Sequence, residues 1–403
     1  MNQQENAGPM GNVGVECLEP IRPILAGNNE FSFDLAHVLP GDGNLFFSPF
    51  NIRMALAMTY AGAREGTEKA MAKVLRFTEG EDQKALHLEF SKFIERIPRT
   101  IEKSGGKLRI ANGIWAQEKY SVELLFRKVL SELYKAPMRL ANFAGDPEAA
   151  RREINAWVEE ATERKIREVI SPKAALNEIV MILVSAIYFN DFWDLPFMPS
   201  RTRNDAFFTP DRPAKNVPTM FGVHPFGYAE SDGPGMPCKF LEMPYKSGLS
   251  FLAVLPAKDS PRRLTFDDLV NSIPRLSEEI VEVWLPKFKM TSSFSAAKAL
   301  MNMGMECAFT KEADFTGISR TARAGSPLMI YDVTHNADIE VDEKGTEAAA
   351  ATTVWMGHQG CQGPVTPPVW KKFVADHPFL FMIREKATGT ILFMGRVEDP
   401  SEG

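Results

Sequence analysis

The residues from Ile339 to Trp370 carry three conflicting local signals, and any fold of the chain must accommodate all of them. Residues 339–342 alternate apolar and acidic side chains, which is typical of a β-strand. The four-alanine run at 348–351 favours a helix. The Gly and Pro residues between 357 and 368 then predict an exposed loop. Such a conflict is expected where one segment serves two conformations.

Length and composition describe an ordinary globular protein. The 403 residues alone would predict two or three domains of about 100–200 residues each. With 44% hydrophobic and 24% charged residues, the chain can bury a large core. The formal net charge of −6 is small and the basic residues are scattered, so no nucleic-acid partner is expected.

Cysteine usage and the N-terminal sequence predict a cytoplasmic protein. The four cysteines form no CxxC pair, so free thiols are expected rather than a disulfide framework. No signal peptide and no Asn-x-Ser/Thr sequon is visible, although an extracellular location would remain open if a signal had been removed. The longest apolar run, Ile179 to Phe189, is too short to span a bilayer, so no membrane partner is expected.

Helical patterns dominate the first half of the chain, and strand patterns dominate the second. Ser48-Pro49 predicts a helix start, with serine as the cap and proline in the first turn. Asp146-Pro147 caps a long amphipathic helix, and Ile179 to Phe189 is typical of a strand buried on both faces. Later strand-like runs lie at 281–290, 329–341 and 378–397. With no linker-like stretch or repeat, we predict one α+β domain over 28–400 after a flexible leader at 1–27.

Motifs of several common enzyme classes are absent, and the chain is not expected to be an enzyme. GxSxG, HExxH, Walker A and GxGxxG do not occur. Ser104-Gly105-Gly106-Lys107 matches SxxK, but it falls in a predicted turn without a companion KTG motif, so a chance match is the better interpretation. The histidines show no metal-ligand spacing, and no cofactor or metal is expected.

The segment after Gly345 acquires a simple pattern if it can become a strand. Its even-numbered residues would then share one face: Thr346, Ala348, Ala350, Thr352 and Val354. This face carries only small or apolar groups, so it could slide over a packed core without clash or buried charge. Glu347 would lie on the other face, in water, and Gly345 would supply a hinge. Composition alone leaves a short alanine-rich helix or a flexible linker as the alternative.

The stretch VDEKGTEAAAAT, Val341 to Thr352, resembles the hinge of the reactive-centre loop in inhibitory members of the serpin family. Further motifs resemble the family in its own order, over roughly residues 28–400. They are Asn44-Leu45-Phe46-Phe47-Ser48-Pro49, Asn155-Ala156-Trp157-Val158, Phe189 with Trp193, Pro196 and Phe197, Leu285-Pro286-Lys287, His377-Pro378-Phe379, and Phe393-Met394-Gly395-Arg396-Val397.

The resemblance implies an α+β serpin fold with about eight to nine helices, three β-sheets and an exposed reactive-centre loop at about 343–370. A target protease would attack the loop as a substrate and form an acyl-enzyme. The freed arm would then insert into the central sheet, and serpin loop insertion is itself a standard example of β-strand addition. Inhibition would then require that loop insertion, driven by the metastable fold, be faster than hydrolysis of the acyl-enzyme.

The resemblance also assigns roles to residues outside the loop. Glu343, Gly345, Thr346, Ala348, Ala349, Ala350, Ala351 and Thr352 match the hinge. Ser48, Pro49, Asn51, Ser185 and His335 match the shutter beneath the parting strands, with serine at 185 where the family usually has asparagine. Trp193, Thr202, Lys287 and Glu343 match the breach, where insertion begins, and we expect a Glu343–Lys287 pair there.

Counting forward from Glu343 by the family's spacing places the cleaved bond between Gln359 and Gly360. His358 and Met356 remain alternatives for the residue before the bond. The backward count from His377-Pro378-Phe379 gives a residue near Pro364 instead, because this loop is several residues longer than usual.

The loop composition narrows the expected partner, a target protease. No Lys or Arg lies between Lys344 and Lys371, which disfavours trypsin-like enzymes, and the lack of acidic residues after Glu347 disfavours caspase-like ones. Chymotrypsin-, elastase- or subtilisin-like serine proteases are favoured, with the inhibitor acting as a monomer. The alternatives are a cysteine-protease inhibitor of the same fold and a non-inhibitory carrier, chaperone or storage serpin.

Overall fold

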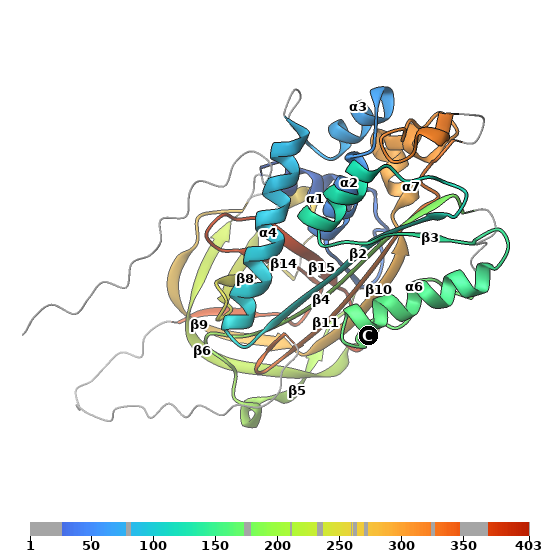
Figure 1. The fold of residues 1–403 in the computed structure, drawn as a ribbon. Coiled ribbons are helices and arrows are strands. Elements are labelled where there is room, and N and C mark those ends of the chain that lie inside the picture. The colour runs from blue at the N-terminus through green and yellow to red at the C-terminus, as the bar shows by residue number, and fades with distance from the viewer. Residues whose placement is uncertain are drawn as a thin grey trace, which may run out of the picture.

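The computed structural model describes most of the chain from Ala26 to Glu402 (Figure 1). The described ranges are 26–77, 82–172, 179–209, 212–231, 237–258, 264–269, 273–323, 327–346 and 370–402, together with Ser260.

Two of the helices begin where the sequence supplies a cap. The Ser48 side chain accepts a hydrogen bond from the backbone N–H of Asn51, with Pro49 at the first helical position. Asp146 caps a second helix in the same way, ahead of Pro147. The α-helices of the described residues are α1 (Ala26–Val38), α2 (Pro49–Tyr60), α3 (Glu65–Val74), α4 (Gln83–Lys103), α5 (Leu124–Lys128), α6 (Pro147–Ala161) and α7 (Ala297–Leu300).

The strands form two hydrogen-bonded sheets. The six-stranded sheet has the order β10-β11-β12-β4-β2-β3, and the nine-stranded sheet has the order β1-β15-β14-β8-β7-β6-β9-β13, with β5 paired to β6. The strands are β1 (Leu45–Phe47), β2 (Lys107–Gln117), β3 (Met138–Ala141), β4 (Met181–Phe192), β5 (Arg203–Phe207), β6 (Lys215–Ser231), β7 (Cys238–Pro244), β8 (Leu249–Pro256), β9 (Ser277–Pro286), β10 (Phe288–Ser295), β11 (Asp332–Asp342), β12 (Gly345–Thr346), β13 (Lys371–Val374), β14 (Phe379–Glu385) and β15 (Ile391–Val397).

The α+β architecture agrees with the prediction, while the described residues form two continuous sheets rather than three. The reason lies in β6, a 17-residue strand. Its first part pairs with β5, its middle with β9, and its end, Gly227 to Ser231, with β7. One long strand therefore joins two smaller sheets into a single hydrogen-bonded ladder.

The six-stranded sheet is covered on both faces. Figure 1 shows α6 lying along its outer face, where Ile154 and Val158 pack with Trp115, Ile182 and Val184 in a separate apolar cluster. Behind the other face lies the main core, in which α2 contacts both β4 and β15. Burial on both faces explains why the run at 181–192 is almost continuously apolar.

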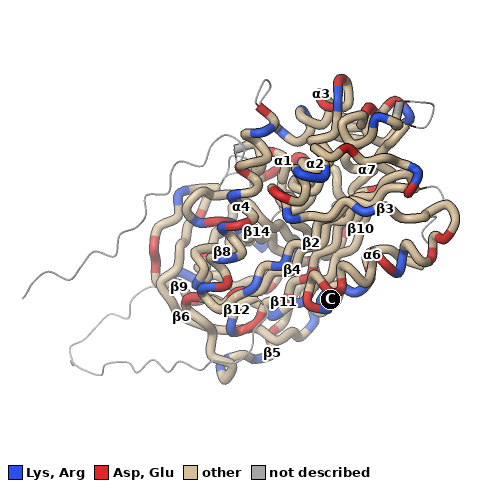
Figure 2. The backbone as a smooth tube through the Cα atoms, viewed as in Figure 1, with Lys and Arg blue, Asp and Glu red and all other residues tan. Residues whose placement is uncertain are grey.

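Charge is distributed without a single-sign stripe, as Figure 2 shows for Lys, Arg, Asp and Glu along the described chain. No helix among the described residues combines the length and the apolar character that crossing a membrane requires. Within the same residues, His, Cys, Asp and Glu side chains form no group of three or more suited to a metal ion. Cys238 is buried and Cys307 is half-buried, and within the described part of the chain neither forms a disulfide.

Candidate functional site

The central feature of the six-stranded sheet is a parallel pair of strands that separates at one end. β4 and β11 pair in parallel from Ile182 and Asp332 up to Tyr188 and Asp338. Beyond that point their ends are no longer paired with each other, and β12 lies between them. Thr346 is opposite Val341 of β11 and opposite Asp191 of β4, antiparallel to both strands. Gly345 and Thr346, near the start of the predicted loop, are therefore already a strand of this sheet.

A tight turn delivers the chain from β11 into β12. The carboxylate of Asp342 accepts hydrogen bonds from the backbone N–H of Lys344 (2.8 Å) and of Gly345 (3.3 Å). At Gly345 a Cβ atom would stand 2.0 Å from the carbonyl oxygen of Asp191, so only glycine can approach β4 this closely.

Four residues expected at the breach come together around this turn. Glu343 accepts hydrogen bonds from Thr202 Oγ1 (2.7 Å) and from Lys287 Nζ (2.8 Å). Trp193 Nε1 donates to the backbone carbonyl of Asp342 at 2.9 Å. Burial alone would raise the pKa of Glu343, but the hydrogen bonds from Lys287 and Thr202 outweigh it and hold the pKa below its ordinary value.

Tyr245 is a further residue of this site that sequence reasoning missed. Its ring stacks on Trp193 with 4.4 Å between centroids, and its hydroxyl shares a 2.6 Å hydrogen bond with Thr346 Oγ1. Burial raises its pKa well above the usual value, so the phenol stays neutral and can donate. Tyr245 lies beside a turn between β7 and β8, and nothing in its local sequence distinguishes it from other turn-flanking aromatics.

The residues expected at the shutter also meet, below the point where β4 and β11 separate. His335 Nε2 accepts from the backbone N–H of Ser48 (3.0 Å), and its Nδ1 lies 3.3 Å from Ser185 Oγ. Asn51 donates to the same hydroxyl at 2.8 Å. Asn112 of β2 donates to Asn51 Oδ1 at 2.7 Å, and this contact was not predicted from the sequence. The available signal was an asparagine within an apolar strand, which indicates a buried polar contact.

The Ser185–His335 contact is not arranged as a catalytic dyad. Because Nε2 accepts the Ser48 N–H, the proton of the neutral imidazole sits on Nδ1, which therefore donates to Ser185 rather than removing its proton. Both residues are completely buried. Burial lowers the pKa of His335 to about 3, so it stays neutral at physiological pH. Pro49, the remaining residue predicted at the shutter, occupies the first position of α2.

The remaining predicted site residues lie outside the described residues. These are the hinge residues Ala348, Ala349, Ala350, Ala351 and Thr352, the predicted bond between Gln359 and Gly360, and the alternatives His358 and Met356. The described site is therefore the start of the loop and the opening between β4 and β11 into which it leads.

Replacing Glu343 with glutamine should destabilise the native fold by about 1–2 kcal/mol, because Lys287 and Thr202 lose a charged acceptor. The effect should vanish in acid. The lowered pKa means that the stabilisation is present above the ordinary carboxyl pKa and is lost as pH falls through the value in the folded protein.

Urea unfolding midpoints at several pH values would measure this effect. Glu340→Gln is the matched control, since Glu340 lies three residues before Glu343, on β11, and its pair with Lys289 is exposed, with a 3.4 Å separation. Equal urea midpoints for the two variants at pH 7 would contradict the stabilising role of Glu343.

Replacing His335 with glutamine should flatten the acid side of the stability profile. A buried neutral histidine with a lowered pKa stabilises the fold above the ordinary value of 6.5, and this contribution falls progressively as pH drops toward about 3. Between pH 7 and 4.5 the wild type should lose about 2–3 kcal/mol more than the variant. His37, which is exposed and has a raised pKa, provides the control: His37→Gln should leave that acid limb in place.

Comparison with known proteins agrees with this geometry. A family model described as Serpin (serine protease inhibitor) matches residues 26–400. A serpin-like protein of Thermococcus kodakarensis is 37% identical over 388 residues, which cover 95% of this chain and 87% of that protein. The leukocyte elastase inhibitor of Bos taurus is 34% identical over 396 residues, covering 94% of this chain and 99% of that protein.

The crystal structure of Serpin48, a highly specific serpin of the insect Tenebrio molitor, shares the fold with a TM-score of 0.82. It is 30% identical in sequence, and the match covers 96% of this chain and 100% of that one. With the family model and the relatives each spanning nearly the whole sequence, this chain belongs to the serpin family.

Proposed function

We propose that this chain is a suicide-substrate inhibitor that traps a serine protease as a covalent acyl complex by inserting its cleaved loop between β4 and β11. The observation that carries the proposal is β12, whose two residues already stand between these strands and antiparallel to both. β12 runs in the direction that insertion requires. A loop that enters between the parallel strands β4 and β11 from this end must run antiparallel to both.

Continuing β12 in register supports insertion of the next residues. Each further residue of the loop moves one position back along β4 and along β11. Ala348 would then lie level with Phe189 and Ile339, and Thr352 with Ser185 and His335. The even-numbered residues would face the main core, where Ile187 and Phe189 point. Small side chains on that face can be accommodated there, and a bulky or charged one cannot.

The chemistry of trapping divides hydrolysis into two steps. The protease serine attacks the carbonyl carbon of the residue before the cleaved bond, for which Gln359 is proposed, and an ester forms as the peptide bond breaks. The departing amine of Gly360 takes up a proton, and the ester remains until water hydrolyses it in the second step. Insertion must precede that second step for the complex to persist, so inhibition depends on the rate of strand entry.

The proposed targets are chymotrypsin-, elastase- or subtilisin-like serine proteases. The absence of Lys and Arg between Lys344 and Lys371 removes the anchor that trypsin-like enzymes need. The similarity to a leukocyte elastase inhibitor supports the same choice. Cysteine proteases of similar preference form the alternative within the same mechanism.

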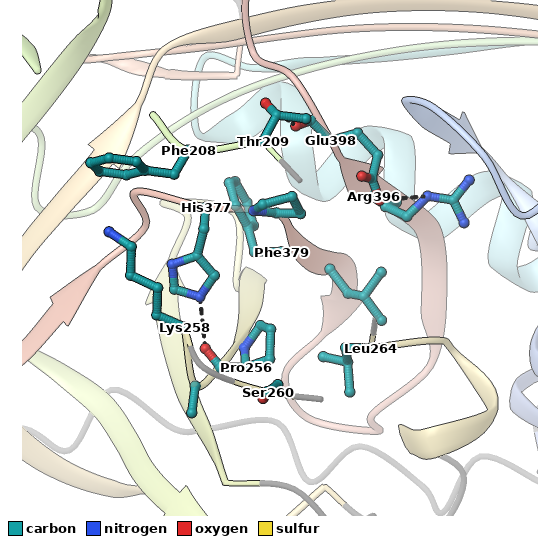
Figure 3. Close-up of a pocket in the computed structure, with 13 residues that line it drawn as sticks. Phe208, Thr209, Pro256, Lys258, Ser260, Leu264, His377, Phe379, Arg396 and Glu398 are labelled. Carbon is teal, nitrogen blue, oxygen red and sulfur yellow. Dashed lines mark hydrogen bonds and ion pairs between the residues drawn. The ribbon is translucent and has the colours of Figure 1, made fainter. Parts of the chain in front are cut away.

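A second candidate function, carriage of a small apolar molecule, is favoured by a cavity of about 510 Å³ beside the start of β14 (Figure 3). Phe208, Leu264 and Phe379 contribute apolar walls. His377 fixes one side through a 2.8 Å hydrogen bond from Nε2 to the Pro256 carbonyl. The size lies within the range of pockets that bind small ligands.

Incubation with chymotrypsin, pancreatic elastase and subtilisin should give a complex of higher mass that survives an SDS gel. Thr346→Arg should turn the chain into a substrate that is cleaved without complex, because Thr346 is fully buried and a charge there would block insertion. Thr346→Ser keeps the hydroxyl that bonds Tyr245 and should retain trapping. Clean cleavage of the wild type by every serine and cysteine protease tested would rule the proposal out.

The carrier alternative predicts saturable binding of the apolar fluorophore 1-anilinonaphthalene-8-sulfonate. Ala257→Trp, at an exposed position on the cavity wall, should weaken that binding by about tenfold. Ala144→Trp, also at an exposed position, is the control. Identical fluorescence titrations of both variants and the wild type would exclude this cavity as a carrier site.

A further inference from the structure

A fully buried carboxylate, that of Asp191, lies beside the inserted hinge at the end of β4. Its Oδ1 accepts the backbone N–H of Phe192 (2.8 Å) and faces the Ser104 hydroxyl at 3.4 Å. Its Oδ2 accepts a hydrogen bond from the hydroxyl of Ser247. Among the described residues no basic side chain pairs with it, so the charge is held by hydroxyl and amide donors alone.

The two serines belong to different parts of the molecule. Ser104 lies in the turn between α4 and β2, and β2 is the strand paired with β4, so Ser104 should move with Asp191. Ser247 lies in the turn between β7 and β8 of the nine-stranded sheet. The Asp191–Ser247 hydrogen bond therefore joins the two sheets, alongside a 2.9 Å bond from the N–H of Lys246 to the carbonyl of Phe192.

Further entry of the loop requires β4 and β11 to separate by about one strand spacing, ~4.8 Å. If β4 shifts away from the β7–β8 turn, the contact between Asp191 and Ser247 breaks. A surface cavity of about 740 Å³ lies next to this contact and is lined by Ser247, Gly248 and Lys103. Separation would thus open a route from the buried carboxylate to water.

We propose that Asp191 is a positioning residue for loop insertion: its carboxylate is kept from water by Ser104 and Ser247 while β4 stays against the β7–β8 turn, and it becomes hydrated when β4 separates to admit the loop. The inference rests on the proposed function, because it concerns the rate of the insertion step.

The direction of the pH effect follows from burial. Burial raises the pKa of Asp191 to about 6, although hydrogen bonds from Ser247, Phe192 and Ser104 oppose the rise. Protonation therefore stabilises the closed arrangement below the ordinary carboxyl pKa, and this stabilisation is lost as pH rises through about 6. Above that pH an ionised carboxylate remains in a site that favours the neutral form, and hydration on opening relieves it. Insertion should become faster as pH rises.

Other charged or titratable groups surround Asp191 on each neighbouring element. Lys107 on β2 pairs with Glu163 instead, and Lys246 packs over the Phe192 ring at 5.9 Å. Tyr245 bonds Thr346, while Lys103 ends α4 and Lys344 precedes β12. Asp342 at the hinge also has a raised pKa, from burial. Comparing the wild type with a variant changed only at Asp191 isolates the part of the pH dependence that comes from Asp191.

The test uses a peptide of sequence AAAATTV, which copies residues 348–354. With both ends blocked it has no titratable group. Its uptake by the full chain is followed by native mass spectrometry between pH 5 and 7.5. The wild-type rate should rise with pH by between about threefold and tenfold, with a midpoint near 6, as expected if opening lowers the pKa toward its ordinary value.

Asp191→Asn should abolish this dependence and should take up the peptide more slowly than the wild type at pH 7.5, by up to about tenfold. Ser247→Ala should keep the dependence but shift its midpoint upward, because losing a donor to the charged form raises the pKa. Asp332→Asn is the matched control. Asp332 is also a carboxyl with a raised pKa, but its partner Ser295 lies on the adjacent β10. The Asp332→Asn substitution should therefore leave the dependence of uptake rate on pH unchanged.

The outcomes separate the two proposals. A wild-type rate that is constant or falls with rising pH, or a profile that persists in Asp191→Asn, overturns the role of Asp191 while leaving trapping intact. A chain that neither takes up the peptide nor forms a protease complex fails both. Circular dichroism checks that Asp191→Asn folds, and if it does not, the midpoint shift in Ser247→Ala decides.

Discussion

The site depends on one geometric constraint: two neighbouring strands of a sheet are parallel, and a third strand enters between them from the open end. β4 and β11 are paired over only part of their length, and β12 completes the sheet where they separate. β11 and β12 are antiparallel, so a short turn is enough to reverse the chain and direct it into the gap. The position of Gly345 against Asp191 fixes where that entry occurs.

Polar side chains lie at the open end of the gap and in the paired part of β4 and β11 below it. At the upper end Glu343, Lys287 and Thr202 hold the turn, and Tyr245 holds Thr346. Lower down, His335 and Ser185 connect the two strands, with Asn51 beneath them. These contacts are satisfied in the present arrangement, and any further entry of a strand must rearrange those that cross between β4 and β11. Buried polar contacts of this kind favour discrete states over gradual deformation.

Several residues that the structure brings together around β12 were named from the sequence, because their signals were local or arranged in a recognisable order. Ser48-Pro49 indicated the start of α2, and the pattern around Glu343 indicated the hinge. Asn112 and Tyr245 were missed, since their roles come from partners 61 and 101 residues away. Asp191 was missed for a similar reason, because burial and two serines from different turns define its environment.

By itself the sequence determined the α+β class, the family and the small-residue alternation after Gly345, because periodicity and motif order are properties of the chain alone. Only the tertiary structure decided that β6 merges two sheets into one and that Gly345 and Thr346 are already a strand. It also placed the Asp191 carboxylate in a closed site between the two sheets. Strand pairing and burial join residues far apart in sequence, and no local pattern records which of them meet.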